Sequence, residues 1–247
     1  LINRMGFNND GVEVLASRLE KERPEGLIVG ANIGKNKITP NEDAAYDYLI
    51  CFERLYHLVD YFTINVSSPN TPGLRELQDK EPLTELLTAL QENNPDDKPV
   101  FLKIAPDLTT EQLDEIVEII IETGLTGVIA TNTTITRNGL TESKESVDSI
   151  GAGGLSGAPL IDMSVSVVRY LKEKSNNSFV VIGVGGIEDY TSAKKHLDAG
   201  ADLLDIDLRT VDDLKFVLVD GRAVNFVKDQ LEGLVIENAF AVHVLNH

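Results

Sequence analysis

The sequence predicts an α/β protein whose parallel strands form a TIM (β/α)8 barrel, and three observations predict this fold. Short, almost continuously apolar segments alternate with longer amphipathic ones, as expected for buried strands connected by helices. Five of the apolar segments end in polar or glycine-rich clusters, and a barrel carries its site on the loops at the carboxyl ends of its strands. The length of 247 residues suits one such domain. An open doubly wound sheet would rarely place polar loops after so many strands.

Six segments are expected to be strands of this sheet. In chain order they are Gly26–Gly34, Tyr61–Ser67, Val100–Ala105, Gly127–Thr133, Phe179–Gly186 and Leu203–Leu208. Lys215–Gly221 is a further candidate, whereas a closed barrel needs eight strands. The sequence therefore predicts a barrel that is short of strands and unusual near its last one.

Amphipathic helices are expected between the strands. The clearest begins at Thr109, which forms a capping-box pattern with Gln112, and ends at Gly124. The others are expected near Gly11–Lys21, Glu42–Leu58, Pro82–Glu92, Ser164–Ser175, Thr191–Gly200 and Ala223–Glu237.

The composition limits the kinds of partner. The net charge is −18, from 40 acidic and 22 basic residues, and a field of this sign repels nucleic acid and anionic lipid. No apolar run approaches the roughly 20 residues that span a bilayer. The chain opens with polar residues, so no signal peptide is expected. The single cysteine, Cys51, excludes an intramolecular disulfide and is typical of a reducing compartment.

The segment "NVSSPNTPG" ends a strand in neutral hydrogen-bonding groups, among them Asn65, Ser68 and Asn70. Amides present donors and acceptors together, which suits a planar ligand with carbonyl and N–H edges. Ser68 is a candidate proton acceptor, although a serine needs a special environment to act as a base. A proline-rich turn capped by Asn and Ser side chains is the alternative reading of this motif.

Lys103 lies within an apolar strand, where its ammonium must be exposed, paired or functional. A ligand that develops negative charge and a salt bridge from a neighbouring strand are both consistent with it. The strand end Ile129–Thr134 is again neutral and polar, and two glycine-rich turns, Gly151–Leu160 and Ile182–Ile187, precede helices. Such turns suit a phosphate bound by backbone N–H groups.

The four histidines, His57, His196, His243 and His247, show no metal-ligand spacing with cysteines or acidic residues. Neither a metal site nor a Ser–His–Asp triad is expected.

Seven motifs, taken in order, resemble one family. They are "NRMGFNN" from Asn3, "NIGKNK" from Asn32, "NVSSPNTPGLR" from Asn65, "LKIAPDL" from Leu102, "IATNTT" from Ile129, "GGLSG" from Gly153 and "IGVGGI" from Ile182. Over residues 1–200 the chain resembles the dihydroorotate dehydrogenases, the flavin enzymes of pyrimidine synthesis. It is most similar to their membrane-associated, quinone-linked class 2, whose base is a serine where the cytosolic class has a cysteine.

The resemblance implies that residues 1–247 form a single flavin-binding barrel domain that oxidises dihydroorotate to orotate in UMP biosynthesis. FMN would accept the hydride from C6 while Ser68 removes the C5 proton, and quinone would be the final acceptor. The full-length parent would lie peripherally on the cytoplasmic face of the membrane through a segment absent here, and this chain alone would be soluble. The implied substrate-binding residues are Asn3, Arg4, Met5, Gly6, Phe7, Asn65, Asn70, Asn132 and Thr133. The implied FMN-binding residues are Asn32, Asn65, Lys103, Thr131, Ser156, Gly157 and Gly186.

The chain departs from the family pattern at both ends. Two barrel strands and a helical pair that precede "NRMGF" in the family are absent. After Gly200 the family continues into a Tyr-Ser/Thr-Gly turn at the phosphate, whereas this chain has Asp205, Asp207, Asp212 and Asp213, whose charge is of the wrong sign for that site. A non-catalytic barrel remnant or interaction scaffold is therefore an alternative. Another FMN barrel, of the dihydropyrimidine dehydrogenase or dihydrouridine synthase kind, would have a cysteine near the position of Ser68.

Overall fold

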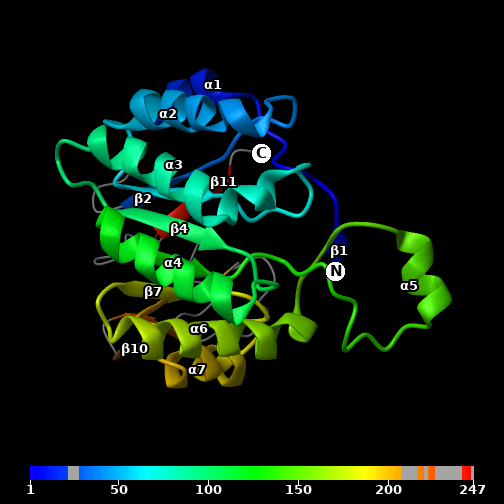
Figure 1. The fold of residues 1–247 in the computed structure, drawn as a ribbon. Coiled ribbons are helices and arrows are strands. Elements are labelled where there is room, and N and C mark those ends of the chain that lie inside the picture. Colours follow the sequence, from blue (N-terminus) through cyan, green and yellow to red (C-terminus); the bar gives the residue numbers. More distant parts are fainter. Residues whose placement is uncertain (22–27, 207–215, 220–221, 226–240, 246–247) are drawn as a thin grey trace.

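The computed structural model describes residues 1–21, 28–206, 216–219, 222–225 and 241–245. Its centre is a parallel sheet of seven strands in the order β11-β2-β3-β4-β5-β7-β8 (Figure 1). Their bounds are β2 Ile28–Ile33, β3 Tyr61–Asn65, β4 Val100–Ile104, β5 Gly127–Ala130, β7 Val180–Gly183, β8 Leu203–Leu204 and β11 Ala241–Leu245. The sheet is a partial TIM barrel, so the predicted fold class is confirmed.

All six expected strands are present, but most are shorter at their carboxyl ends than the apolar pattern suggested. The ends of the segments beginning at Tyr61 and Gly127, which include Ser67 and Thr131–Thr133, are loops, and the segment beginning at Val100 ends one residue early, before Ala105. Of the segment Lys215–Gly221, β9 (Phe216–Val219) is a strand, but it pairs antiparallel with β10 (Arg222–Asn225) in a separate two-stranded sheet. The edge strand beside β2 is instead β11, which the sequence analysis did not anticipate.

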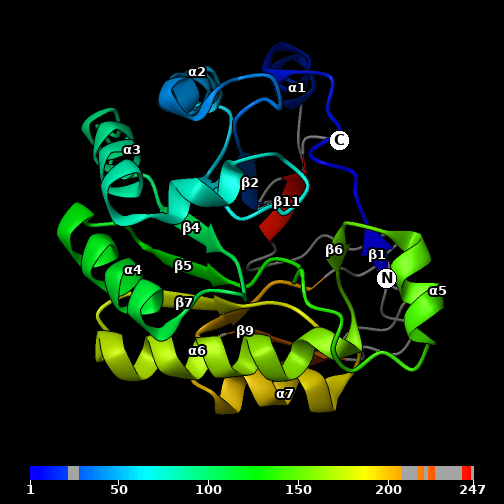
Figure 2. The same cartoon turned by 45° about the vertical axis from the view of Figure 1, so that its right-hand side comes forward.

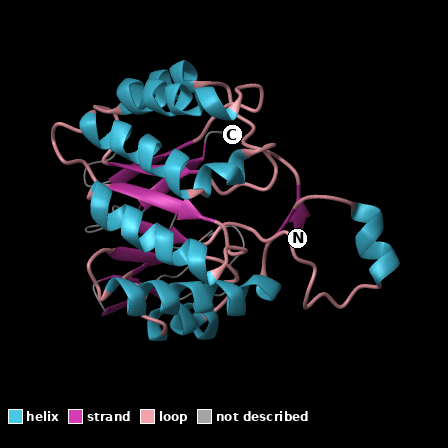
Figure 3. Cartoon of the chain, viewed as in Figure 1, coloured by secondary structure: helices cyan, strands magenta, loops and turns pink. Residues whose placement is uncertain are grey.

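Six helices cover the outer face of the sheet (Figure 3). They are α1 Val12–Leu19, α2 Ala44–Leu55, α3 Lys80–Glu92, α4 Thr110–Thr123, α6 Ile161–Ser175 and α7 Tyr190–Asp198. The predicted capping box at Thr109 and Gln112 is present, and Gly124 closes α4 in a left-handed conformation. The helix expected over Ala223–Glu237 is wrong at its start, because Ala223–Asn225 pair with β9; residues 226–237 lie outside the described residues.

Two layers of apolar side chains lie on opposite faces of the sheet. The larger fills the space between the strands and the helices, and includes Phe52, Phe62 and Leu87. The smaller lies inside the curve of the sheet and consists of Tyr61, Phe101, Ile129 and Ile182, with Val180 and Val184 against them. These residues alternate with the outer layer along each strand, as a period of two requires. The inner layer therefore fills the interior of the partial barrel below the loops at the carboxyl ends of the strands.

An arm projects from the carboxyl side of the sheet (Figure 2). It contains α5 (Lys144–Ile150) and β6 (Gly154–Leu155), and β6 pairs antiparallel with β1 (Ile2–Asn3) at the start of the chain. Short 3-10 helices lie at η1 (Asn41–Asp43), η2 (Leu74–Gln78) and η3 (Ala158–Leu160). The β1–β6 pairing brings the first residues of the chain beside the loops that follow the strands. Among the described residues, no helix combines the length and the apolar character that crossing a membrane requires.

Candidate active site at the carboxyl ends of the strands

Neutral polar side chains gather where β3 and β5 end. Asn65 is buried, and its Oδ1 accepts hydrogen bonds from the Ser67 backbone N–H (3.3 Å) and the Ser67 hydroxyl (3.1 Å). Asn132, in the loop after β5, donates from Nδ2 to Ser67 Oγ (3.0 Å) and to Asn65 Oδ1 (3.4 Å). Asn132 Oδ1 in turn accepts from the Thr133 backbone N–H at 2.7 Å. The two strand ends are thus joined by amides and hydroxyls without a formal charge.

Ser68 is buried at the edge of this group. Its Oγ accepts a hydrogen bond from the Asn70 backbone N–H at 3.3 Å, and the Asn70 side chain donates from Nδ2 to Asn3 Oδ1 at 3.2 Å. Asn3 belongs to β1, so the start of the chain and the loop after β3 meet here. Gly6 lies against the backbone carbonyl of Asn70. The structure therefore brings Asn3 and Asn70 to the candidate base, although they are 67 residues apart.

The arm packs directly on these loops. A Cβ on Gly154 would lie 2.1 Å from Thr133 Oγ1, and a Cβ on Gly153 would lie 2.5 Å from the backbone oxygen of Asn3. Close approach of these segments therefore accounts for both glycines.

The second glycine-rich turn lies at the start of α6. Gly186 has a φ of 71°, and a Cβ there would lie 2.7 Å from the Ile161 backbone nitrogen. Ala158, just after Gly157, donates its backbone N–H to Glu188 Oε1 at 3.0 Å. The two glycine turns are neighbours, as expected, but a carboxylate already accepts one of the N–H groups that an anion would use. Asp207, Asp212 and Asp213 lie outside the described residues.

His196 of α7, which is fully buried, contacts the turn that contains Gly185 and Gly186. Its Nε2 is 3.0 Å from the backbone oxygen of Gly185. Burial lowers the pKa of His196, which favours the neutral imidazole. Because a carbonyl can only accept, Nε2 carries the proton.

Lys103 forms an ion pair inside the curve of the sheet. Its Nζ is 3.5 Å from Asp205 Oδ2, and the two side chains are 13% and 27% exposed. Of the two readings of this lysine, the structure shows the salt bridge, although its partner follows β8 and not a strand adjacent to β4. Burial, and then the charge of Asp205, raise the pKa of Tyr61, which places that carboxylate near the inner layer. Asp205 therefore partly neutralises the Lys103 ammonium that a ligand at this site would contact.

The other expected site residues fall into two groups. Asn32 is buried on β2, opposite Thr63 of β3, and Phe7 packs against the large core cluster. The remaining ones contact other parts of the chain or solvent. Arg4 donates to the backbone oxygens of Ala152 (3.0 Å) and Ile150 in the arm, and Met5 is 59% exposed. Thr131 shares a hydrogen bond with Ser164 of α6 (2.8 Å), and the Ser156 backbone N–H donates to the Leu1 backbone oxygen (2.9 Å).

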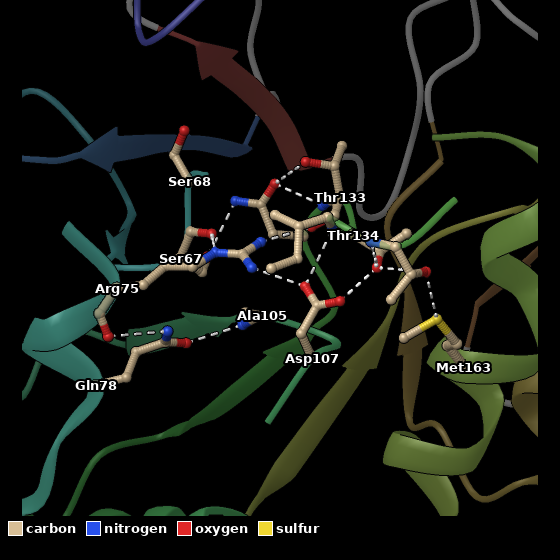
Figure 4. Close-up of polar contacts among 12 residues, drawn as sticks. Ser67, Ser68, Arg75, Gln78, Ala105, Asp107, Thr133, Thr134 and Met163 are labelled. Atoms are coloured by element: carbon tan, nitrogen blue, oxygen red, sulfur yellow. Dashed lines mark hydrogen bonds and ion pairs between the residues drawn. The ribbon is translucent and has the colours of Figure 1, made fainter. Parts of the chain in front are cut away.

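Sequence reasoning missed two charged residues, Arg75 and Asp107, which connect the same loops (Figure 4). Arg75 Nη1 lies 2.7 Å from Asp107 Oδ2, and the side chains are 21% and 14% exposed. The available signal was that Arg75 is the only charge in "NVSSPNTPGLR" and that Asp107 is the only acidic residue in "KIAPD". Among the described residues, no group of three or more His, Cys, Asp or Glu side chains could hold a metal ion.

Residues 1–218 match the family model for dihydroorotate dehydrogenase. The chain is 55% identical, over 210 residues, to the dihydroorotate dehydrogenase (quinone) of Christiangramia forsetii, covering 83% of this chain and 60% of that protein. It is 50% identical, over 205 residues, to the dihydroorotate dehydrogenase (quinone) of Gloeobacter violaceus, covering 83% of this chain and 56% of that protein. A crystal structure of Eimeria tenella DHODH with ferulenol superposes with a TM-score of 0.76 at 36% identity, covering 83% of this chain and 61% of that one. The chain therefore spans 56% to 60% of the length of these two curated relatives.

Proposed function

This chain belongs to the quinone-linked class of the dihydroorotate dehydrogenase family, and from that premise we propose that it oxidises dihydroorotate to orotate. FMN is the proposed hydride acceptor and quinone the proposed final acceptor, in the route to UMP. One observation carries the proposal: Asn3 and Asn132, from distant parts of the chain, donate to or accept from the loop that holds Ser68 and Asn70. Because quinones lie in the membrane, a peripheral position on the cytoplasmic face of the membrane is part of the proposal.

Ser68 is the proposed base for the C5 proton. The Asn70 backbone N–H donates to its Oγ at 3.3 Å, and a donor aimed at an oxygen stabilises negative charge on that oxygen. Burial excludes most of the water that would compete for the proton. Asn3, Asn65, Asn70, Asn132 and Thr133 are the proposed partners of the substrate's carboxylate and imide edges, because amides and hydroxyls can match both donors and acceptors.

Members of this family use FMN, and most of the described site fits its ring. FMN supplies a ring that accepts hydride. Asn32 and Asn65 provide amides at the carboxyl ends of the neighbouring strands β2 and β3. Lys103 provides a cation that would stabilise negative charge on the reduced ring. Two contacts oppose it: Asp205 pairs with Lys103, and Glu188 accepts from the N–H that follows Gly157. The residues therefore fit the ring better than the phosphate.

A visible absorption spectrum of the purified chain, after incubation with FMN and desalting, tests the proposal. We expect retained flavin bands that dihydroorotate bleaches under anaerobic conditions. Ser68→Ala should retain FMN but lose the bleaching, whereas Ser166→Ala, an exposed serine of α6 outside the site, should retain both. Bleaching that persists in Ser68→Ala would remove the assigned base.

A second candidate is a non-catalytic remnant that binds no flavin. The Lys103–Asp205 ion pair favours it, because the cation then has an internal partner. A colourless protein whose melting temperature is unchanged by FMN or orotate would support this candidate. Another type of FMN barrel with a catalytic cysteine is not supported, since the single cysteine lies in α2 on the outer side of the sheet.

A further inference from the structure

Arg75 extends from η2 and contacts three separate chain segments with its guanidinium group. Nε donates to the backbone oxygen of Ser67 at 2.9 Å, Nη2 donates to the backbone oxygen of Thr133 at 2.8 Å, and Nη1 pairs with Asp107 Oδ2 at 2.7 Å. All three nitrogens are therefore engaged, each with a different loop: those after β3, β5 and β4 (Figure 4). Only the planar fork of an arginine can make this arrangement.

Asp107 continues the connection towards the arm. Its Oδ1 accepts a hydrogen bond from the Thr134 hydroxyl, and its Oδ2 also accepts the Ile135 backbone N–H at 3.3 Å. The carboxylate thus joins the loop after β4 to the loop after β5 at two successive residues. Gln78 reinforces this side, because it accepts the Ala105 backbone N–H at 2.9 Å and donates to the Arg75 backbone oxygen at 3.3 Å.

The contacted backbone atoms adjoin the proposed reacting groups without being part of them. The Ser67 carbonyl belongs to the peptide that leads into Ser68. Thr133 donates its own N–H to Asn132 Oδ1, so a shift of the Thr133 backbone would move the Asn132 amide. Because both side chains are largely removed from water, moving or removing one of them would leave the other as a buried, unpaired charge, which is costly.

We propose that Arg75 and Asp107 are positioning residues, which act together to hold the loops of Ser68 and Asn132 in one fixed arrangement. They touch neither substrate nor cofactor in this proposal. Its catalytic consequence depends on the proposed function: the rate of proton removal from C5 falls when Ser68 is free to move, since a displacement of about 1 Å can cost roughly 100-fold in rate.

The first test needs no flavin. Arg75→Lys keeps the positive charge but loses the fork, so amide hydrogen exchange should accelerate by about tenfold or more in all three loops, residues 66–72, 105–109 and 131–136. Arg54→Lys is the matched control, because Arg54 lies in α2 and pairs with Glu13 (2.9 Å) and Glu20 (3.0 Å) away from these loops. Faster exchange confined to residues near position 75 would overturn the proposed coupling of the loops.

The second test uses the FMN-loaded protein and dihydroorotate deuterated at C5. With Arg75→Lys we expect the maximal rate of flavin reduction to fall between about 10-fold and 100-fold and the C5 isotope effect to increase, while FMN affinity stays within about twofold. Loosened loops with an unchanged reduction rate and isotope effect would overturn the positioning role.

Two further comparisons keep these outcomes separable. If Arg75→Lys fails to fold, the double variant Arg75→Gln/Asp107→Asn replaces both charges and leaves neither unpaired, and the same readouts apply. If the unmodified protein shows no flavin reduction, the proposed function fails by itself. The exchange experiment then still decides whether the pair fixes the three loops.

Discussion

The substitution Gly30→Ala tests how the inner layer of the barrel is packed. Gly30 lies on β2 opposite Tyr61 of β3, and a Cβ at this position would lie 2.0 Å from the ring carbon Cζ and 2.4 Å from Cε1 and Cε2. An ordinary contact begins at 3.4 Å, so the ring would have to retreat by about 1.4 Å (3.4 − 2.0). The absence of a side chain at Gly30 is therefore what admits the Tyr61 ring.

The ring has little room to retreat. Tyr61 is 8% exposed and lies edge-on to Phe101, with ring centroids 5.8 Å apart and an interplanar angle of 87°. Overpacking of a stiff, enclosed site typically costs about 1–3 kcal/mol. Because a whole aromatic ring must move, we expect Gly30→Ala to lower the free energy of unfolding by about 3 kcal/mol, the upper end of that range.

Urea unfolding followed by circular dichroism measures this free energy. Gly34→Ala is the matched control, since a Cβ there would make its nearest contact at an ordinary 3.4 Å. In a Tyr61→Ala background, Gly30→Ala should cost at least about 1 kcal/mol less than it does alone, because the clash is gone. Equal costs at positions 30 and 34, or additive costs in the double variant, would refute the reasoning.

Three other predictions follow from separate parts of the structure. Thr109→Ala removes the N-cap of α4 and should lower the free energy of unfolding by about 1 kcal/mol in urea titrations, whereas Thr110→Ala, one residue on, should change it by less than about 0.5 kcal/mol. Burial raises the pKa of Cys51 to about 11, so its alkylation by iodoacetamide at pH 8 should be about 100-fold slower than that of a thiol with the ordinary value of 9.0. A rate that reaches its plateau below pH 10 would contradict this pKa. Asp205→Asn frees Lys103 and should tighten FMN binding by about tenfold, or roughly 1.4 kcal/mol, in a flavin fluorescence titration. An unchanged affinity would mean that Lys103 does not face the flavin.

The raised pKa of Cys51 also affects the stability of the protein at alkaline pH. Because the folded protein holds the Cys51 thiol protonated up to about pH 11, its unfolded form loses that proton first as the pH rises. The contribution of this group to stability is complete below the unfolded pKa and disappears between about pH 9 and pH 11.

Local patterns in the sequence accounted for much of the scaffold. The strands from Tyr61 and Val100 and the helix capped by Thr109 follow from residue spacing within one segment, and these elements are present. Strand ends were extended too far, because polar residues that finish a strand and polar residues that follow it look alike in sequence. Ala223–Asn225 were misassigned since short apolar segments do not distinguish a helix from a strand when the pairing partner is unknown.

Long-range pairings were beyond sequence reasoning. Asn3 and Asn70 were both expected in the site on the basis of resemblance, yet the β1–β6 pairing that carries Asn3 there joins residues more than a hundred positions apart. The Arg75–Asp107 pair was missed for the same reason, because neither motif alone indicates the other. The Lys103 ion pair was foreseen as an alternative, since a buried ammonium requires a partner, but the identity of Asp205 depends on how β8 is placed in the sheet.

The pairing of β1 with β6 also affects the order in which the molecule can be assembled. Strands β2 to β5 join neighbours in sequence, and each can pair as soon as the next segment is available. Ile2 must wait for Leu155, with the whole intervening chain closed into a loop, and the entropic cost of closure grows with loop length. During synthesis at about 5–20 residues per second, Asn3 therefore reaches Asn70 only after most of the sheet has emerged. Strands β2 to β5 can therefore pair before Asn3 is held at the candidate site, whereas β7, β8 and β11 are synthesised after it can be.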